Sequence, residues 1–273
     1  MKKAVVLNDT NDYHHGCRKV MEYLHTDLIM NGYEIISSSR RSNEFLEECD
    51  LLVLNGEGTM HHDKPIPHEL LSMLKKAKKS GAKTAMINSV WQSMTIDDEM
   101  KDVLSDTYIS VREVKSQYAM YETIGKKVDV HLDLSFFVDV PDLLSTERDM
   151  VVGKFFAQPD YRPGNLPVVD IFQIDWDTLV NILRYTNWFI TGRHHEMYAS
   201  CKARCPFSTL SGNTWKNEGL FETAGVEIPV GSPTLIHDNI PKFVDECKEK
   251  RGEYEKLFNW MHRQPKFTIA NKL

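Results

Sequence analysis

Three pairs of adjacent histidines each lie a few residues after a short apolar run. The pairs are His14–His15, His61–His62 and His194–His195, and the runs before them are KAVVL, LLVL and WFI. Such runs are typical of buried parallel strands, and the ligands of open α/β sheets bind beyond the carboxyl ends of the strands. Histidine, carboxylate, arginine and glycine residues at three strand ends suit anionic ligands and proton transfer. The spacing therefore predicts an active-site cleft.

The segment TGRHHE, after the third run, holds the strongest candidates. Gly192 allows the chain to turn closely past a ligand. Alternate residues of an extended segment share a side, so we expect Arg193 and His195 to face the ligand while His194 faces away. Arg193 is suited to binding a phosphate or carboxylate, and His195 to general acid or base catalysis. The structural alternative is an arginine ion pair with a helix-capping histidine.

Lys216 is a second candidate for binding a phosphate. It follows Asn213 and precedes an expected glycine-containing helix. Its ammonium would then lie beside an anion at the strand end. A surface lysine is the alternative, because lysine is mostly exposed in folded proteins.

The loop NGEGTMHHD follows the second apolar run and exposes backbone donors at its two glycines. It has neither the lysine of a P-loop nor the spacing of a dinucleotide fingerprint. Glu57, between the glycines, is expected to act as a base on an acceptor hydroxyl or to hold a sugar hydroxyl; the alternative is a turn residue. Of His61 and His62, one is expected to face the acceptor and the other to be solvated or to cap a helix.

The first loop, NDTNDYHHGC, lies directly before an expected helix, whose N-terminal N–H groups can receive an anion. Asp9 and His15 are candidate catalytic groups, and Asp12 and His14 are candidate acceptor-binding groups. Capping of the helix by Asp12 and His15 is the alternative.

The five cysteines form no CxxC motif, and their odd number does not indicate a disulfide framework. We expect them to be reduced and structural, although Gly16 and Cys17 at a helix start indicate close packing or close approach of a ligand. Adjacent histidines point apart, and no pair has the i, i+4 spacing of helical zinc motifs. No metal and no cofactor are therefore expected. A metal assembled from separate histidine loops is the alternative that the sequence leaves open.

Composition narrows the classes of partner. The net charge of −6 argues against a general nucleic-acid binder, although local arginines and helix N-termini can still hold an anion. The N-terminal apolar run is too short for a signal peptide, and no stretch approaches the roughly 20 apolar residues of a membrane helix. We expect a cytoplasmic protein whose membrane contact, if any, is peripheral.

Strand and helix signals alternate along the chain, which predicts an α/β protein with parallel sheets and right-handed crossovers. Strands are expected at 3–9, 33–38, 50–58, 82–90, 107–113, 128–133, 168–174, 188–193 and 206–210, and the apolar run 150–156 is expected to open a second α/β unit. Helices are expected at 15–32, 42–49, 65–81, 100–106, 114–125, 176–187, 196–205, 214–225 and 239–264. The last of these has an approximate apolar stripe and is expected to be one long helix.

The polar, proline-bearing residues 141–148 indicate a linker. They separate a Rossmann-like domain at 1–140 from a second Rossmann-like domain at 149–273 that includes the C-terminal helix. Two such domains with parallel sheets facing a central cleft describe many group transferases. The first domain would serve the acceptor and the second the donor.

The chain resembles the polysaccharide pyruvyl transferase family, whose fold is like that of the two-domain, GT-B-like glycosyltransferases. The strongest match is the segment FITGRHHEMYASCKARCPFSTLSGNTWKNEGL. Its matching positions are Thr191, Gly192, Arg193, His195, Ala199, Pro206 and Lys216. A second match falls on Arg112, Ser116, Gly125 and Asp133. The similarity spans roughly Val5 to Leu220.

The resemblance implies transfer of a pyruvyl group from phosphoenolpyruvate to a hydroxyl pair of a hexose in cell-surface (capsule) polysaccharide or its lipid-linked precursor. Arg193, Lys216 and Arg112 would bind the phosphate and carboxylate of the donor. His195 would protonate the enol, and Glu57 or a histidine of the N-terminal loops would accept the hydroxyl proton.

Two other functions are consistent with the same residues. A glycosyltransferase would use Arg193, His195 and Lys216 to bind the phosphate of an activated sugar donor, and Glu57 or Asp9 to act on the acceptor. A non-catalytic glycan-binding or assembly subunit is the third possibility, and the gathering of histidine, carboxylate and arginine at strand ends argues against it.

Overall fold

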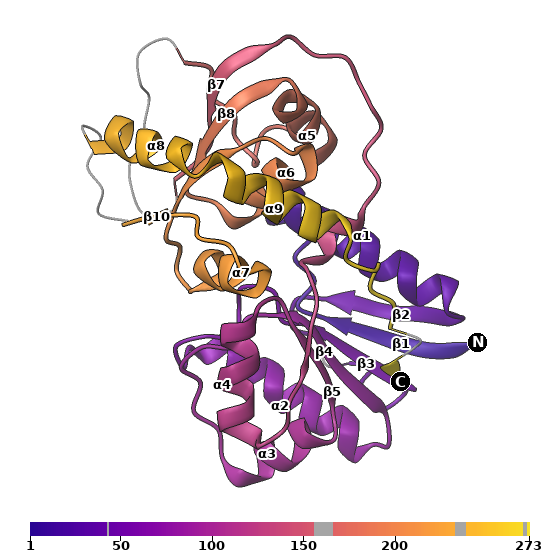
Figure 1. Ribbon diagram of the computed structural model, residues 1–273. Helices are drawn as coiled ribbons and strands as arrows, with labels where there is room; N and C mark the ends of the chain where they lie inside the picture. Colours follow the sequence, from indigo (N-terminus) through magenta and orange to yellow (C-terminus); the bar gives the residue numbers. More distant parts are fainter. Residues whose placement is uncertain (43, 156–165, 233–238, 270–271) are drawn as a thin grey trace. The chain divides into compact units, whose positions relative to one another are not determined.

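The structure is a computed structural model that describes residues 1–42, 44–155, 166–232, 239–269 and 272–273 (Figure 1). It is an α/β protein whose two sheets contain only parallel strand pairs among these residues. The chain forms two compact units. Unit 1 comprises Met1–Thr10, Val20–Leu134 and Lys266–Leu273, and unit 2 comprises Asn11–Lys19 and Ser135–Pro265. The predicted fold class, an α/β chain with two parallel sheets, is confirmed.

Unit 1 is built on a six-stranded sheet in the order β2-β1-β3-β4-β5-β6. The strands are β1 (Lys2–Leu7), β2 (Tyr33–Ser39), β3 (Leu51–Asn55), β4 (Lys83–Ser89), β5 (Tyr108–Val111) and β6 (Asp129–Val130). The helices are α1 (His15–Met30), α2 (Pro65–Lys79), α3 (Asp98–Ser105) and α4 (Val114–Ile124). Every residue of β3 is buried, which explains why its sequence is a continuous apolar run.

Local sequence signals account for the ends of these helices. Proline occupies the first turn of α2, where its missing N–H costs no hydrogen bond. The Asp97 side chain accepts a hydrogen bond from Met100 N at 2.8 Å and so caps α3. The helix expected at 42–49 is wrong, because residues 44–48 form turns. So short a segment is a marginal helix, and only Leu46 and Cys49 of its described residues are buried.

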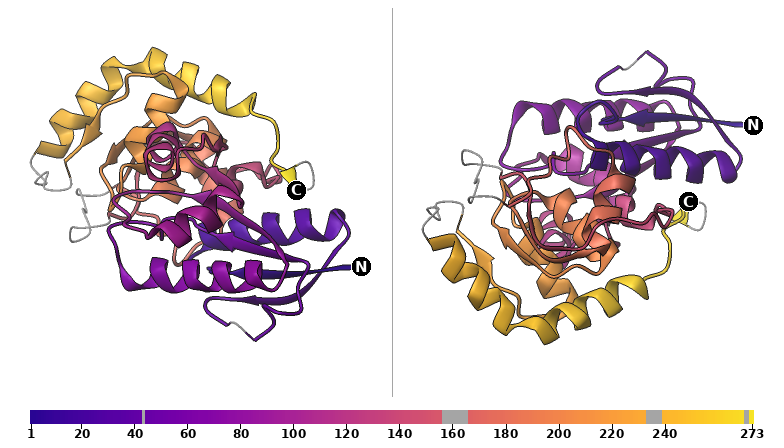
Figure 2. Two further views of the ribbon diagram at one scale, coloured as in Figure 1. Left: turned by 90° about the horizontal axis from the view of Figure 1, so that it is seen from below. Right: turned by 90° about the horizontal axis from the view of Figure 1, so that it is seen from above.

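Unit 2 is built on a four-stranded sheet in the order β10-β9-β8-β7. The strands are β7 (Arg148–Val152), β8 (Thr186–Thr191), β9 (Phe207–Leu210) and β10 (Val230–Gly231). The helices are α5 (Trp176–Arg184), α6 (His194–Ala203), α7 (Lys216–Ala224), α8 (Ile240–Glu249) and α9 (Arg251–His262), and a short 3₁₀ turn, η1 (Leu134–Phe137), lies at the start of the unit. The expected single C-terminal helix is instead two, which meet at an angle next to Lys250 (Figure 2).

The strand expected at 168–174 is also wrong. Only an isolated bridge between Val152 and Val168 is present, and the chain then turns. The Asp170 side chain accepts a hydrogen bond from Phe172 N at 2.9 Å, and its carbonyl accepts from Gln173 N at 2.8 Å. Asp at the start of a turn competes with strand pairing in this way, so the apolar residues around it do not extend into the sheet.

The two units differ from the ranges 1–140 and 149–273 in three places. Unit 2 begins at Ser135, so residues 135–140 and the expected linker 141–148 belong to it. Asn11–Lys19 belongs to unit 2, where His15 N donates to the carbonyl of Ile171 at 3.3 Å. Lys266–Leu273 belongs to unit 1, where Tyr23 donates to the carbonyl of Phe267 at 2.6 Å. Helix α1 therefore begins in unit 2 and continues in unit 1.

Among the described residues, we find no helix with the length and apolar character needed to cross a lipid bilayer.

Candidate functional site

The end of β8 leads directly into α6. Gly192 N donates to the carbonyl of Lys154 at 2.9 Å, and Arg193 N donates to the hydroxyl of Thr191 at 2.9 Å. Arg193 is the N-cap residue and the helix begins at His194. The expectation that Arg193 and His195 share one side of an extended segment is therefore wrong, because the strand has already ended before either histidine.

The N-termini of α6 and α7 lie together at the carboxyl edge of the unit 2 sheet. His194 and Asn217 are both buried, and Nδ1 of the histidine is 3.0 Å from Oδ1 of the amide. The Asn217 Nδ2 also donates to the carbonyl of Leu210 at 2.9 Å, which fixes the start of α7 to the end of β9. Arg193 precedes α6 and Lys216 begins α7. The N-termini of α6 and α7, with the cationic residues Arg193 and Lys216, therefore lie at the carboxyl edge of the unit 2 sheet.

Neither cation is fully exposed. The Lys216 Nζ donates to the Asn213 side chain at 2.9 Å, and the Arg193 guanidinium lies over the ring of Phe172, with Cζ 5.2 Å from the ring centroid. Phe172 also contacts His14 edge-on, with ring centroids 5.3 Å apart. The turn at Asp170 thus places an aromatic ring between Arg193 and His14, an arrangement that the sequence analysis missed because it expected a strand there.

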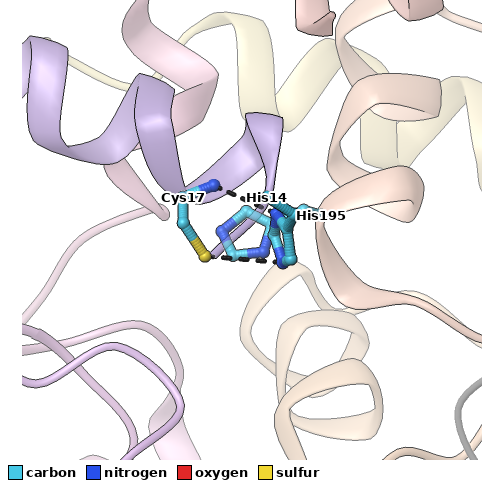
Figure 3. Close-up of side chains that lie close together, drawn as sticks. All are labelled: His14, Cys17 and His195. Carbon is cyan, nitrogen blue, oxygen red and sulfur yellow. Dashed lines mark hydrogen bonds between the residues drawn. The ribbon is translucent and has the colours of Figure 1, made fainter. Parts of the chain in front are cut away.

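His14, Cys17 and His195 form a compact cluster in unit 2 (Figure 3). One ligating atom from each residue lies within 4.8 Å of the others. The Cys17 Sγ is 3.4 Å from Nε2 of His14, and the two imidazole rings pack edge-on with centroids 4.8 Å apart. The sequence predicts a reduced, structural Cys17, and the structure places its thiol beside two imidazoles. The signal that could have found it is the three-residue spacing of His14 and Cys17 at a helix start, which puts both on one face.

Gly16 allows this cluster to form. A Cβ atom at Gly16 would lie 2.6 Å from Cβ and 2.7 Å from Cγ of His195, which is closer than real Cβ atoms approach. Close packing at the start of the predicted helix was expected from Gly16 and Cys17, and the packing partner is the start of α6.

Glu196 is a fully buried carboxyl at the edge of the unit 2 sheet, and it is not among the predicted site residues. It accepts hydrogen bonds from the Thr191 hydroxyl at 2.5 Å, Lys154 N at 2.9 Å and Ile171 N at 3.3 Å. Burial raises the pKa of Glu196 to about 7, although these hydrogen bonds and the charge of Arg193 act in the opposite direction. Glu196 therefore joins the end of β8 to two neighbouring backbone segments at the edge where Arg193 lies.

Glu57 lies in a polar network of unit 1. Its backbone is left-handed (φ 41°) and its side chain is buried, with Oε2 accepting from the Thr10 hydroxyl at 2.7 Å. Asn8, also left-handed (φ 58°), donates from Nδ2 to the carbonyl of Asn55 at 2.7 Å. A strained backbone at neighbouring strand ends is a frequent property of functional loops.

The other predicted residues of unit 1 have partners of their own. Asp9 accepts a hydrogen bond from Ser38 at 2.5 Å. His61 is buried and His62 exposed, with their Nδ1 atoms 2.7 Å apart. Arg112 is buried and donates to Asp133 at 2.6 Å in an ion pair from which water is excluded. Five of the predicted site residues therefore lie in unit 1: Asp9, Glu57, His61, His62 and Arg112.

Unit 2 contains the remaining predicted residues: Asp12, His14, His15, Gly192, Arg193, His195 and Lys216. The structure brings His14, Arg193 and His195 together around Phe172 and Gly16. His15 is the first residue of α1 and is held by its backbone N–H to Ile171. Asp12 is exposed in the preceding turn.

No protein-family model matches the chain, and no curated protein sequence matches it. Solved structures do match. The Staphylococcus aureus protein MnaA, solved with UDP, is 10% identical at a TM-score of 0.58, covering 99% of this chain and 94% of its own. The UDP-GlcNAc 2-epimerase of Methanocaldococcus jannaschii is 9% identical at a TM-score of 0.51, covering 94% and 96%. The chain has a GT-B-like fold.

A plant glycosyltransferase extends this likeness. Arabidopsis thaliana UGT89C1, solved with UDP-L-rhamnose, is 8% identical at a TM-score of 0.55, covering 96% of this chain and 94% of its own. The fold is therefore shared with both UDP-sugar epimerases and glycosyltransferases, and identities this low establish the fold alone.

Replacing Gly16 by alanine is expected to destabilise unit 2. The new methyl group would meet Cβ and Cγ of His195, which are close to the backbone and cannot swing away. Overpacking of this kind costs about 1–3 kcal/mol of unfolding free energy, measured by chemical denaturation. Gly252→Ala in α9 is the matched control, because nothing lies within 4 Å of its Cβ and alanine favours a helix by up to about 1 kcal/mol. Equal stability of Gly16→Ala and wild type would contradict the close approach.

Glu196 is expected to make the stability of the protein depend on pH. Its folded pKa of about 7 lies above the ordinary value of 4.5, so the folded state holds the proton more tightly than the unfolded state. The contribution is fully present below pH 4.5 and is lost as the pH rises to about 7, a change of about 3 kcal/mol at 1.4 kcal/mol for each pKa unit.

Glu196→Gln should remove this dependence of stability on pH. The unfolding free energy of the variant, relative to that of wild type, should therefore increase as the pH rises from 4.5 to about 7. Denaturation curves at several pH values measure the difference. Glu249→Gln, at an exposed position of α8, controls for the loss of a carboxylate. A constant difference between Glu196→Gln and wild type from pH 4.5 to 8 would show that the buried carboxyl does not titrate there.

Proposed function

We propose that the chain is a transferase that uses a nucleoside diphosphate sugar as donor, and that the donor's phosphates bind at the carboxyl edge of the unit 2 sheet. The observation that carries this proposal is the contact between His194 and Asn217, which holds the N-termini of α6 and α7 side by side. Arg193 and Lys216 flank the same two helix starts.

This arrangement suits a diphosphate for a physical reason. The first N–H groups of a helix have no partner within the helix, and the helix dipole favours an anion beside them. Arg193 adds a planar fork that matches phosphate oxygens, and Lys216 adds a compact positive charge. The net charge of −6 does not oppose binding, because the local groups determine the field at the site.

The chemistry required of this edge is stabilisation of a leaving group. An acceptor hydroxyl attacks the anomeric carbon, the bond from that carbon to the phosphate oxygen breaks, and the nucleoside diphosphate leaves with the bonding electron pair. Arg193, Lys216 and the helix N-termini would stabilise the charge that develops on it. The acceptor, a saccharide or lipid-linked glycan, gives up its hydroxyl proton to a general base as the new bond forms.

The GT-B-like fold supports the nucleotide-sugar donor more directly than phosphoenolpyruvate. The S. aureus protein was solved with UDP and the plant enzyme with UDP-L-rhamnose. The pyruvyl transfer implied by the sequence resemblance would employ the same cations, with His195 protonating the enol. The two reactions therefore differ in the donor, which makes the donor the quantity to measure.

Thermal-shift titrations with UDP, UDP-N-acetylglucosamine and phosphoenolpyruvate test the proposal. A ligand that binds the native state raises the melting temperature, so the uridine compounds should stabilise the wild type. Arg193→Gln and Lys216→Gln should each weaken binding by about 10- to 100-fold, because a hydrogen bond to a charged group contributes about 1.5–3 kcal/mol.

The matched control is Arg251→Gln, which removes an exposed cation from the first residue of α9 and should leave binding unchanged. Stabilisation by phosphoenolpyruvate alone would replace the nucleotide-sugar donor with pyruvyl transfer. No response to any of these ligands would overturn both.

A further inference from the structure

We propose that His14, Cys17 and His195 bind one zinc ion through three protein ligands, with the fourth coordination position open. This site goes beyond the proposed function, because it requires neither a sugar donor nor an acceptor. All three residues belong to unit 2, so the site is complete within one compact unit.

The ligand set matches the chemistry of zinc. Zinc prefers imidazole nitrogen and thiolate sulfur, and three protein ligands with one open position are typical of sites where the metal contacts water or a substrate. Hard cations such as magnesium and calcium prefer oxygen ligands and are not suited to two histidines and a cysteine.

The distances are close to those that a tetrahedral ion requires. Bond lengths of about 2.3 Å to sulfur and 2.0 Å to nitrogen give ligand separations of about 3.5 Å between nitrogen and sulfur and about 3.3 Å between nitrogens. The Sγ of Cys17 is 3.4 Å from Nε2 of His14, and all three ligating atoms lie within 4.8 Å of one another (Figure 3). Movement of the ligating atoms by about 1 Å would bring all three separations to those of a tetrahedral zinc site.

The surroundings hold the ligands in place. Cys17 is 2% exposed and His195 is 7% exposed, so two of the three ligands have little freedom. Gly16 allows His195 to pack directly against the start of α1. The Cys17 thiol and the His195 imidazole therefore come from the first turns of α1 and α6, two helices that are far apart in the sequence.

Binding of the ion sets the protonation of each ligand. The Cys17 thiol releases its proton to solvent and coordinates as thiolate. His14 coordinates through Nε2 as neutral imidazole, so its ring proton lies on Nδ1. The contact of 3.2 Å between Cys17 N and that Nδ1 is then given up. This cost is small, because the contact lies at the long end of the range for N–H hydrogen bonds.

The test uses the whole chain, stripped of metal with a chelator and titrated with Zn²⁺ and with Co²⁺. We expect one Zn²⁺ per chain, a rise in melting temperature on binding, and a Co²⁺ spectrum with a thiolate charge-transfer band and the intense visible bands of a tetrahedral site. Cys17→Ser and His195→Gln should lose the band and weaken Zn²⁺ binding by at least about 100-fold, since loss of even an outer partner costs 10- to 100-fold.

Two controls isolate the cluster. Cys49→Ser removes a buried thiol of unit 1, and His15→Gln removes the histidine next to His14; both should bind Zn²⁺ as the wild type does. The charge-transfer band also separates this site from the His61–His62 pair, which supplies no sulfur.

The proposal is overturned if wild type gives no thiolate band with Co²⁺, or if Cys17→Ser binds Zn²⁺ as tightly as wild type. If Cys17→Ser does not fold, as judged by its melting curve without metal, His14→Gln takes its place, and the wild-type spectrum decides independently of any variant. No sugar donor is present in these titrations, so their failure is distinct from failure of the proposed transferase activity.

Discussion

The close packing of α1 against α6, which requires a residue without a side chain at Gly16, is the constraint on which the site of unit 2 depends. Gly16 meets the Cβ of His195, and no larger residue fits in that space. The contact holds the first turn of α1 in unit 2 and brings Cys17 and His14 beside His195. A segment close to the N-terminus therefore completes a site whose other residues come from the second half of the chain.

The buried carboxyl of Glu196 connects backbone segments at the carboxyl edge of the unit 2 sheet, where Arg193 lies. Its three hydrogen bonds come from β8, from the segment after β7 and from the turn at Ile171. That turn carries Phe172, which contacts both the Arg193 guanidinium and His14. Burial of the carboxyl costs free energy when it is ionised, as its raised pKa shows. The same side chain connects three backbone segments near Arg193 through its hydrogen bonds.

The alternation of strands and helices, and the gathering of polar residues after the strands, could be predicted because both depend on local patterns. Periodicity and glycine stops are visible within a few residues. The cluster of His14, Cys17 and His195 could not be predicted, since it depends on a contact between distant segments. The predicted orientation of His195 is also wrong, because α6 begins at His194 and the segment is not extended there. This helix start depends on the Thr191 hydroxyl, which accepts a hydrogen bond from Arg193 N.

Each compact unit is assembled from segments that are far apart in the chain, and this has a consequence for biosynthesis. In unit 1, Tyr23 donates to the Phe267 carbonyl and Asp27 accepts from the Ile269 N–H, and these partners lie 244 and 242 residues further along the chain. Asn11–Lys19 likewise waits for Ile171 and His195 before its partners in unit 2 exist. Domains usually fold as they are translated, N-terminal first. Here each unit needs residues that are translated long after its first segment, so neither unit can complete its packing in that order.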